Sequence, residues 1–428
     1  MRLSLLLAAL SAAVGSAASI NDVERARPVQ NDDAGRNVSM PLFSDLEEMS
    51  RIVDISYCTG LIATGISKPF NCWCRCGDFP HFELIKSWHT GLHLHSDSGG
   101  YIAVDHQKER IIITFRGTYN IAGWIADFGL SPQEYKPFPG AEDQEDGQVE
   151  VGKTTKSKRQ VSKCVDCAVH SGFHLAWKNT RFHTLDAVRE QVERFPTYEL
   201  HAVGHSLGAA VAAFAAMDFD ARGWKPIVTT FGEPRVGNLG MNRYIDETFG
   251  LNQQAEEHQN DDRGSLRWRR VTHTNDPIPL LPPTEWGYAM HGGEIHITQP
   301  SLSPDIYHAQ HCHGAFDAQC IAGQDATYPE QIGKNLLKQR GIWGAFVEDV
   351  PELLRNLMRW QLPHRYRFWQ MLVAHRDYFW RLGLCVPGGD PTGGGGNFPE
   401  LAAWREQRGI PSGKGPIGEV VSEVEKEL

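Results

Sequence analysis

The sequence predicts an α/β protein with a mainly parallel central sheet that helices cover on both faces. The continuous apolar run at 111–115 is typical of a strand buried on both faces. Strand-like segments follow at 198–204, 225–238 and 267–283, and the last two end in glycine- or proline-rich loops. An alanine-rich, helix-like segment at 206–219 separates the first two strands. This alternation favours a parallel sheet, because neighbouring parallel strands need a crossover connection.

Further elements surround this unit. Residues 41–56 have the apolar spacing of a helix, and residues 101–104 are predicted to form a β-hairpin with 111–115 across a charged turn. Residues 141–163 are charged and lack apolar periodicity, so we expect a loop insertion there. Residues 170–195 predict an amphipathic helix. Its apolar face holds Phe173, Trp177, Leu185, Val188 and Val192.

Length and charge limit the organisation and the partners. The chain has 428 residues, 41% of them hydrophobic, and a formal net charge of −10. Without a basic region, nucleic acid is not an expected partner. We expect a monomer with a single domain at 41–386, including an insertion at about 301–370. Flexible segments are expected at 19–40 and in the Gly/Pro-rich tail 387–428, which has room for one short helix.

The first residues indicate secretion. Arg2 precedes an apolar run that is too short to span a membrane, and small residues follow it. Residues 1–18 are therefore predicted to be a signal peptide, with cleavage near Ala18, although a buried N-terminal helix is the alternative. No later stretch is apolar and long enough to predict a transmembrane segment. In the secretory route, Asn37 in Asn-Val-Ser is a candidate glycosylation site.

The cysteine count predicts disulfides. A secreted chain with nine cysteines is expected to form several bridges and to leave at least one thiol over. A local Cys312–Cys320 bridge is expected, and two of Cys72, Cys74 and Cys76 are expected to pair. Zinc is not expected, because the Cys/His spacings do not match paired metal ligands.

The stretch VGHSLGAAVA at 203–212 carries the main chemical prediction. A nucleophilic serine on a sharp strand-to-helix turn crowds the side chains two residues before and after it, so glycine is favoured at both positions. Gly204, Ser206 and Gly208 fit this pattern. The alternative is a glycine-rich helix start in which Ser206 only caps the helix. The backbone N–H of Leu207, the residue after the nucleophile, is one expected oxyanion donor.

A base and an acid should follow the serine in the order acid, then histidine. Asp276 lies in the loop at the carboxyl end of a predicted strand, where parallel sheets place ligand-binding groups, although it could instead only cap the turn before Pro277. The residues alone leave the histidine open. The candidates after Asp276 are His291, His296, His308, His311, His313, His364 and His375.

In combination these motifs resemble the fungal class 3 lipases, a family of triacylglycerol lipases with the α/β-hydrolase fold. The resemblance covers about 45–300 and a short piece at 375–385. It rests on ITFRGTYNIAGWIADF, CVDCAVHSGFHLAW, VGHSLGAAVA, TFGEPRVGN and HTNDPIPLLPP. HGGEIHI resembles a strand that carries a structural histidine, which argues against His291 as the base.

The resemblance also assigns roles. The family's catalytic histidine is followed by aromatic residues and then by a cysteine bonded to the end of the first helix, which favours His375 over His364 and implies Cys58–Cys385. It further implies a Cys164–Cys167 bridge and an oxyanion donor at Thr118. A lid is implied at 119–128, where an apolar stripe would otherwise be interpreted as core. The stripe consists of Ile121, Trp124, Ile125 and Phe128.

The predicted function is a secreted Ser–His–Asp lipase that acts on acylglycerols at an oil–water or membrane interface, with no metal or organic cofactor. A phospholipase or a feruloyl-type esterase on the same scaffold is the alternative, and the apolar lid favours lipid. A non-catalytic lipid-binding protein is the alternative from another class. The distance of 99 positions from Asp276 to His375 is long for the family. The segment between them is predicted to be an insertion that packs on the domain, a second cap or an interfacial anchor.

Overall fold

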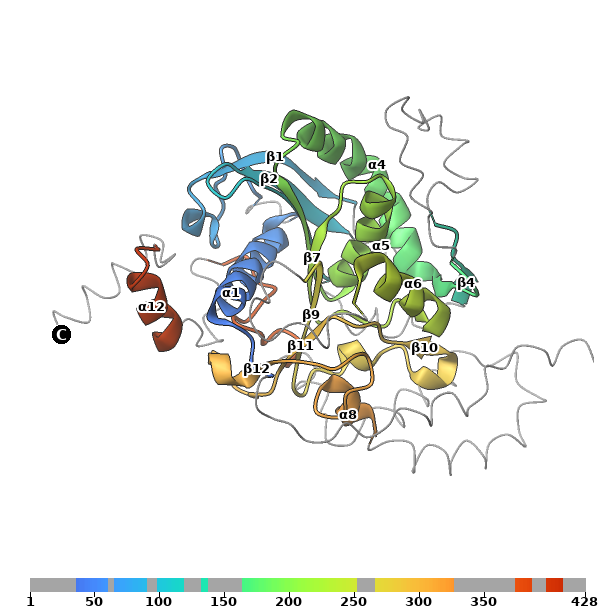
Figure 1. Ribbon diagram of the computed structural model, residues 1–428. Helices are drawn as coiled ribbons and strands as arrows, with labels where there is room; N and C mark the ends of the chain where they lie inside the picture. Colours follow the sequence, from blue (N-terminus) through green and yellow to red (C-terminus); the bar gives the residue numbers. More distant parts are fainter. Residues whose placement is uncertain are drawn as a thin grey trace, which may run out of the picture. The chain divides into compact units, whose positions relative to one another are not determined.

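The computed structural model describes residues 36–60, 65–90, 98–118, 132–137, 164–251, 266–326, 374–386 and 398–410. Its centre is an eight-stranded sheet in the order β1-β2-β3-β6-β7-β9-β11-β12 (Figure 1). The five strands from β3 to β11 are parallel, whereas β1, β2 and β12 run antiparallel to their neighbours. The strands are β1 Phe82–His89, β2 Gly99–Asp105, β3 Arg110–Phe115, β6 Glu199–His205, β7 Ile227–Phe231, β9 Trp268–His273, β11 Glu294–Ile297 and β12 Ala309–His311.

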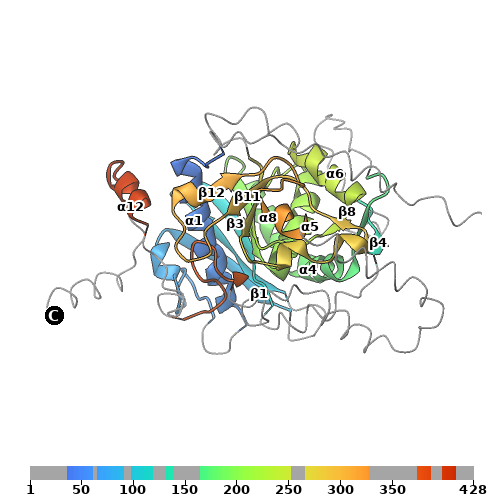
Figure 2. The same cartoon turned by 90° about the horizontal axis from the view of Figure 1, so that it is seen from below.

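Helices cover both faces of this sheet, as predicted. Helix α1 (Met40–Ile55) packs on one face, and helices α4 (Ser171–Arg194) and α5 (Leu207–Ala221) pack on the other (Figures 1 and 2). Successive strand residues point to opposite faces. In β3, Ile111 and Ile113 enter the core under α4 and α5, whereas Ile112 enters the core under α1. Burial on both faces explains why this strand is a continuous apolar run.

A second, smaller antiparallel sheet lies beside the main one. It has the order β10-β8-β5-β4. Helix α6 (Leu239–Phe249) begins directly after β8 and contacts both β5 and β10. The strands are β4 Pro132–Glu134, β5 Ala168–His170, β8 Gly237–Asn238 and β10 Tyr288–Ala289.

The prediction of a flexible segment at 19–40 does not hold at its carboxyl end, where residues 36–38 are bound to the edge of the domain. Asn37 pairs with Gln310 of β12, and the Val38 N–H donates to the Ala309 carbonyl. A buried ion pair between Arg36 and Asp317, 2.8 Å long, fixes the same segment. These contacts satisfy edge groups of β12 that would otherwise lack partners. The side chain of Asn37 remains exposed.

The first part of the expected insertion packs on the domain, and the tail contains one short helix, for which the sequence left room. Residues 301–326 contribute η7 (Ile306–His308), β12 and α8 (Ile321–Ala326) to the edge of the domain. After the Gly-rich stretch, helix α12 (Pro399–Glu406) packs on α1. Its Leu401 is buried, and Arg405 binds Glu47 at 2.8 Å. Residues 327–373 lie outside the described residues.

Four disulfides join eight of the nine cysteines. They are Cys58–Cys385, Cys72–Cys76, Cys164–Cys167 and Cys312–Cys320. Cys74 is a buried free thiol. The bridge from Cys58 to Cys385 spans 327 positions and connects the end of α1 with the segment that follows His375.

Because a longer loop loses more unfolded-state entropy when it is closed, we expect this bridge to be the most stabilising. Replacing Cys58 and Cys385 together by serine should lower the free energy of unfolding by about 5–6 kcal/mol in urea titrations. The matched control, Cys312→Ser with Cys320→Ser, opens a loop of 8 positions and should cost about 2–3 kcal/mol. Equal losses for the two pairs would contradict this expectation.

Candidate active site

Ser206 occupies a strained turn between β6 and α5. Its φ and ψ are 60° and −129°, a combination that non-glycine residues rarely adopt. A Cβ atom on Gly204 would lie 2.3 Å from the carbonyl oxygen of Gly208, and one on Gly208 would lie 2.2 Å from that of Phe115. Both glycines therefore allow the close strand-to-helix approach that Ser206 requires.

Asp276 follows β9 and is fully buried in a set of hydrogen bonds. Its carboxylate accepts from His375 Nδ1 at 2.9 and 3.0 Å, from the Ile278 N–H at 2.9 Å and from the Tyr378 hydroxyl. Burial alone would raise the pKa of Asp276, but the charge of His375 and these hydrogen bonds hold it below its usual value. Asp276 therefore stays ionised and orients the His375 ring.

Tyr378 was not predicted. Burial and the adjacent Asp276 carboxylate raise the pKa of its hydroxyl well above the usual value. The hydroxyl therefore stays protonated and donates a hydrogen bond to the carboxylate. The only sequence signal is its place in HRDYFW, three residues after His375.

His375 is brought beside the serine turn from the other end of the chain. Its ring stacks on that of His205, the residue before Ser206, with centroids 4.8 Å apart. Close packing is possible because Gly232, which follows β7, has no side chain. A Cβ there would lie 2.7 Å from His375 Cε1 and 3.0 Å from an oxygen of Asp276. Among the described residues, neither His375 Nε2 nor Ser206 Oγ has a hydrogen-bond partner, although both are buried. Loose catalytic hydrogen bonds are common before substrate binds.

The other candidate bases have different surroundings. His291 uses both ring nitrogens, bonding to the Gly292 carbonyl and to Glu233, each at 2.9 Å. His296 bonds to Thr272 at 2.8 Å. His308, in η7, pairs with Asp305. His311 and His313 lie in and after β12 at the sheet edge, and His364 lies outside the described residues.

The expected oxyanion donors lie at two neighbouring segment ends. Leu207 is the first residue of α5, where backbone N–H groups are not used inside the helix. Thr118 follows β3, and a Cβ on its neighbour Gly117 would lie 2.7 Å from that of Ser206. Close approach of this segment to the serine therefore depends on Gly117. The predicted lid residues Ile121, Trp124, Ile125 and Phe128 lie outside the described residues.

Comparison with known proteins gives the family. The profile described as "Lipase (class 3)" matches residues 112–286. A secreted mono- and diacylglycerol lipase 2 from Gibberella zeae is 44% identical over 372 residues, covering 83% of this chain and 85% of that protein. Lipase A from Sodiomyces alcalophilus is 41% identical over 396 residues, covering 88% and 90%. This chain belongs to the class 3 lipase family. It is therefore a carboxylic ester hydrolase of the lipase type.

A solved structure supports the fold of this lipase. The Lip2 lipase from Yarrowia lipolytica is 25% identical, with a TM-score of 0.58, covering 82% of this chain and 97% of that chain. No helix in the described ranges is long and apolar enough to cross a membrane. The one described group with metal-ligand spacing is Glu294 with Cys312 and Cys320, and those two cysteines are joined in a disulfide.

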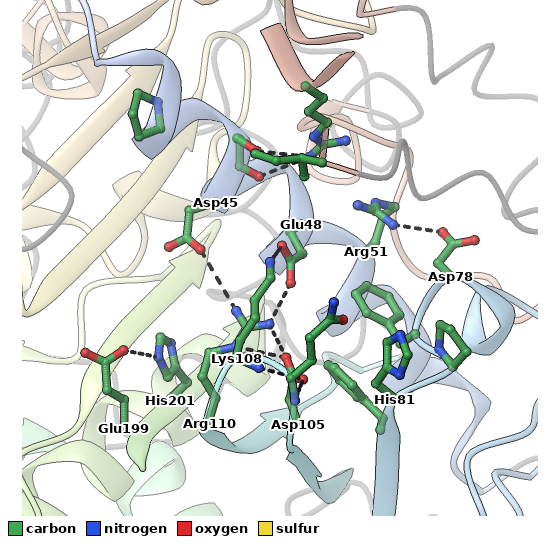
Figure 3. Close-up of a pocket in the computed structure, with 18 of the residues that line it drawn as sticks. Asp45, Glu48, Arg51, Asp78, His81, Asp105, Lys108, Arg110, Glu199 and His201 are labelled. Atoms are coloured by element: carbon green, nitrogen blue, oxygen red, sulfur yellow. Dashed lines mark hydrogen bonds and ion pairs between the residues drawn. The ribbon is translucent and has the colours of Figure 1, made fainter. Parts of the chain in front are cut away.

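The lipase also has a cavity of about 830 Å³ away from the serine (Figure 3). It is lined by Arg110 and Glu199, which begin β3 and β6, so it lies at the opposite end of these strands from Ser206. Its charged side chains bind one another. Arg110 donates to Glu48 and Asp105, at 2.6 Å each, and Lys108 binds Glu48 as well. We interpret this network as structural, because its carboxylates are already bound to guanidinium and ammonium groups.

The network predicts a pH effect on stability. Burial raises the pKa of Glu48, but Arg110 and Lys108 lower it more, to about 2. Because the pKa of Glu48 is lower in the folded protein than in the unfolded chain, the ionised carboxylate stabilises the fold at pH values above the unfolded-state pKa. This contribution is lost as the pH falls from about 5 toward 2. Between pH 6 and pH 3, the stability difference between the wild type and Glu48→Gln should shrink by about 2 kcal/mol in urea titrations. Exposed Glu134→Gln is the control and should follow the wild type at both pH values.

Proposed function

We propose that this lipase is secreted and hydrolyses acylglycerol esters with Ser206 as nucleophile, His375 as base and Asp276 as the acid that orients His375. The observation that carries the proposal is the buried junction of the strained Ser206 turn, the His375 ring and the Asp276 carboxylate. The predicted signal peptide, the four disulfides and the name of the Gibberella zeae relative support secretion.

In this mechanism His375 Nε2 accepts the Ser206 proton as Oγ attacks the ester carbonyl. Asp276 keeps the proton on Nδ1 and stabilises the imidazolium that forms. His375 then returns the proton to the leaving alcohol, and water releases the fatty acid from the acyl-enzyme by the same two steps. The backbone N–H groups of Leu207 and Thr118 are assigned to the developing oxyanion, where each donor is worth about 3 kcal/mol of barrier.

The substrate class is acylglycerols at a lipid surface. The name of the 44% identical relative supports mono- and diacylglycerols as substrates, since that protein is called a mono- and diacylglycerol lipase. The predicted apolar lid supports a lipid substrate over an aryl ester.

Hydrolysis of emulsions tests the proposal. Purified enzyme is given tri-, di- and monoacylglycerol emulsions, a phospholipid vesicle and a soluble short-chain ester, with Ser206→Ala measured beside it. We expect fatty acid release from an acylglycerol emulsion above the rate on vesicles, and at least a 10⁴-fold loss in the variant. Activity confined to the soluble ester would reject the acylglycerol assignment, and an active Ser206→Ala enzyme would reject the nucleophile.

A further inference from the structure

A buried chain of hydrogen bonds joins four segments around the candidate site without taking part in proton transfer. Tyr57 Oη and His205 Nδ1 are 2.5 Å apart, and His205 Nε2 is 2.9 Å from the carbonyl oxygen of His375. The Gly117 N–H donates to Tyr57 Oη at 3.0 Å. Tyr57 and His205 expose only 3% and 1% of their surfaces, so water does not compete for these bonds.

Chemistry fixes the direction of each bond. The His375 carbonyl can only accept, so His205 Nε2 carries a proton. Burial and the neighbouring His375 ring lower the pKa of His205 to about 3, so the ring is neutral and Nδ1 has a free lone pair. The Tyr57 hydroxyl therefore donates to Nδ1, and its oxygen accepts from Gly117.

These hydrogen bonds connect the segments of the candidate site that must keep fixed distances from one another during catalysis. Gly117 precedes Thr118, and His205 precedes Ser206. His205 also holds the backbone of His375 and stacks on its ring, with an interplanar angle of 24°. Tyr57 is itself anchored, because it lies beside the Cys58–Cys385 disulfide in η2 (Ser56–Cys58). A neutral His205 also avoids a second positive charge next to the imidazolium.

We propose that Tyr57 and His205 are positioning residues. The Tyr57 hydroxyl holds the His375 backbone through His205, and it holds the Gly117–Thr118 segment directly, so that both stay in place around Ser206. This inference rests on the proposed roles of Ser206 and His375. Its consequence is a loss of kcat without a matching loss of substrate binding when the hydroxyl is removed.

The test uses two tyrosine truncations on a soluble short-chain ester. Tyr57→Phe should lower kcat about tenfold, the equivalent of one hydrogen bond, with KM within twofold of the wild type. Tyr101→Phe is the matched control, because the Tyr101 hydroxyl is also buried and donates to a carbonyl of α1, that of Ile52, at 2.8 Å. Tyr101→Phe should lose about as much thermal stability as Tyr57→Phe but keep its kcat within twofold of the wild type. Equal kcat values for the two variants, or a change confined to KM in Tyr57→Phe, would overturn the proposal.

A second pair of variants tests His205, and decides the matter if Tyr57→Phe does not fold. His205→Leu removes both hydrogen bonds and should lower kcat more than Tyr57→Phe does. His205→Gln keeps an amide N–H for the His375 carbonyl and an oxygen for Tyr57, so it should recover at least part of that loss. Equal kcat in the two variants would count against positioning. Ser206→Ala in the same assay separates the two claims, because it stays active only if the proposed function is wrong.

Discussion

Replacing His375 with alanine is expected to lower kcat by about 10⁴-fold or more, whereas His364→Ala should remain within about twofold of the wild type. His375 begins the segment HRDYFW and His364 begins the similar segment HRYRFW. His364→Ala is therefore the matched control for His375→Ala. Nδ1 of His375 lies 2.9 Å from Asp276, and the His375 ring stacks on His205, the residue before Ser206. In the proposed mechanism His375 is the base, so its removal leaves Ser206 without a group to accept its proton.

Both variants are measured on a soluble ester, with thermal unfolding as the check on folding. Loss of hydrolysis in His364→Ala together with a fully active His375→Ala would assign the base to the other segment. It would also leave the buried Asp276–His375 pair without a catalytic role.

The second large effect is expected at Gly232. Its φ is +60°, and a Cβ would lie 2.7 Å from both His375 Cε1 and the Tyr378 hydroxyl. Gly232→Ala should therefore displace the His375 ring and reduce kcat by about 100-fold, since a misplacement of about 1 Å can cost that much.

Gly223→Ala is the matched control for this substitution. Gly223 also has a positive φ, +84°, but nothing lies within 4 Å of its added Cβ. It should lose about 1–2 kcal/mol of stability through backbone strain alone and keep its kcat. A Gly232→Ala enzyme with the activity of Gly223→Ala would show that the site tolerates a methyl group there.

Local chemistry explains which parts of the fold were predictable. The strand β3 and the turn at Ser206 are encoded in consecutive residues, because burial on both faces and backbone crowding restrict the sequence at each position. Strand β1 was not predicted: its burial is mixed, and a register shift between Leu84 and Lys86 interrupts the alternation. Strand β12 has three residues, too few for a periodic pattern.

The residues of the candidate site also fall into two groups, those that local sequence predicts and those that depend on distant partners. Gly204, Ser206 and Gly208 could be read from one turn, and Asp276 from the end of its strand. His375 could not be chosen from the residues alone, because its contact with Asp276 spans 99 positions, and the family resemblance made that choice. The roles of Tyr57 and Tyr378 depend on partners 148 and 102 positions away, and in sequence they look like ordinary core aromatics. The lid and most of the insertion stay predictions.

Trapping with a serine-reactive phosphonate tests the central claim most directly. The enzyme is incubated with a fluorescent alkyl phosphonate, residual hydrolysis is followed, and the labelled peptide is identified by mass spectrometry, with Ser206→Ala as control. We predict one label per chain, located on Ser206, with activity lost in proportion to labelling and no label in the variant. Full inactivation with the label on another residue, or an unlabelled but active enzyme, would contradict the assignment of Ser206 as the nucleophile.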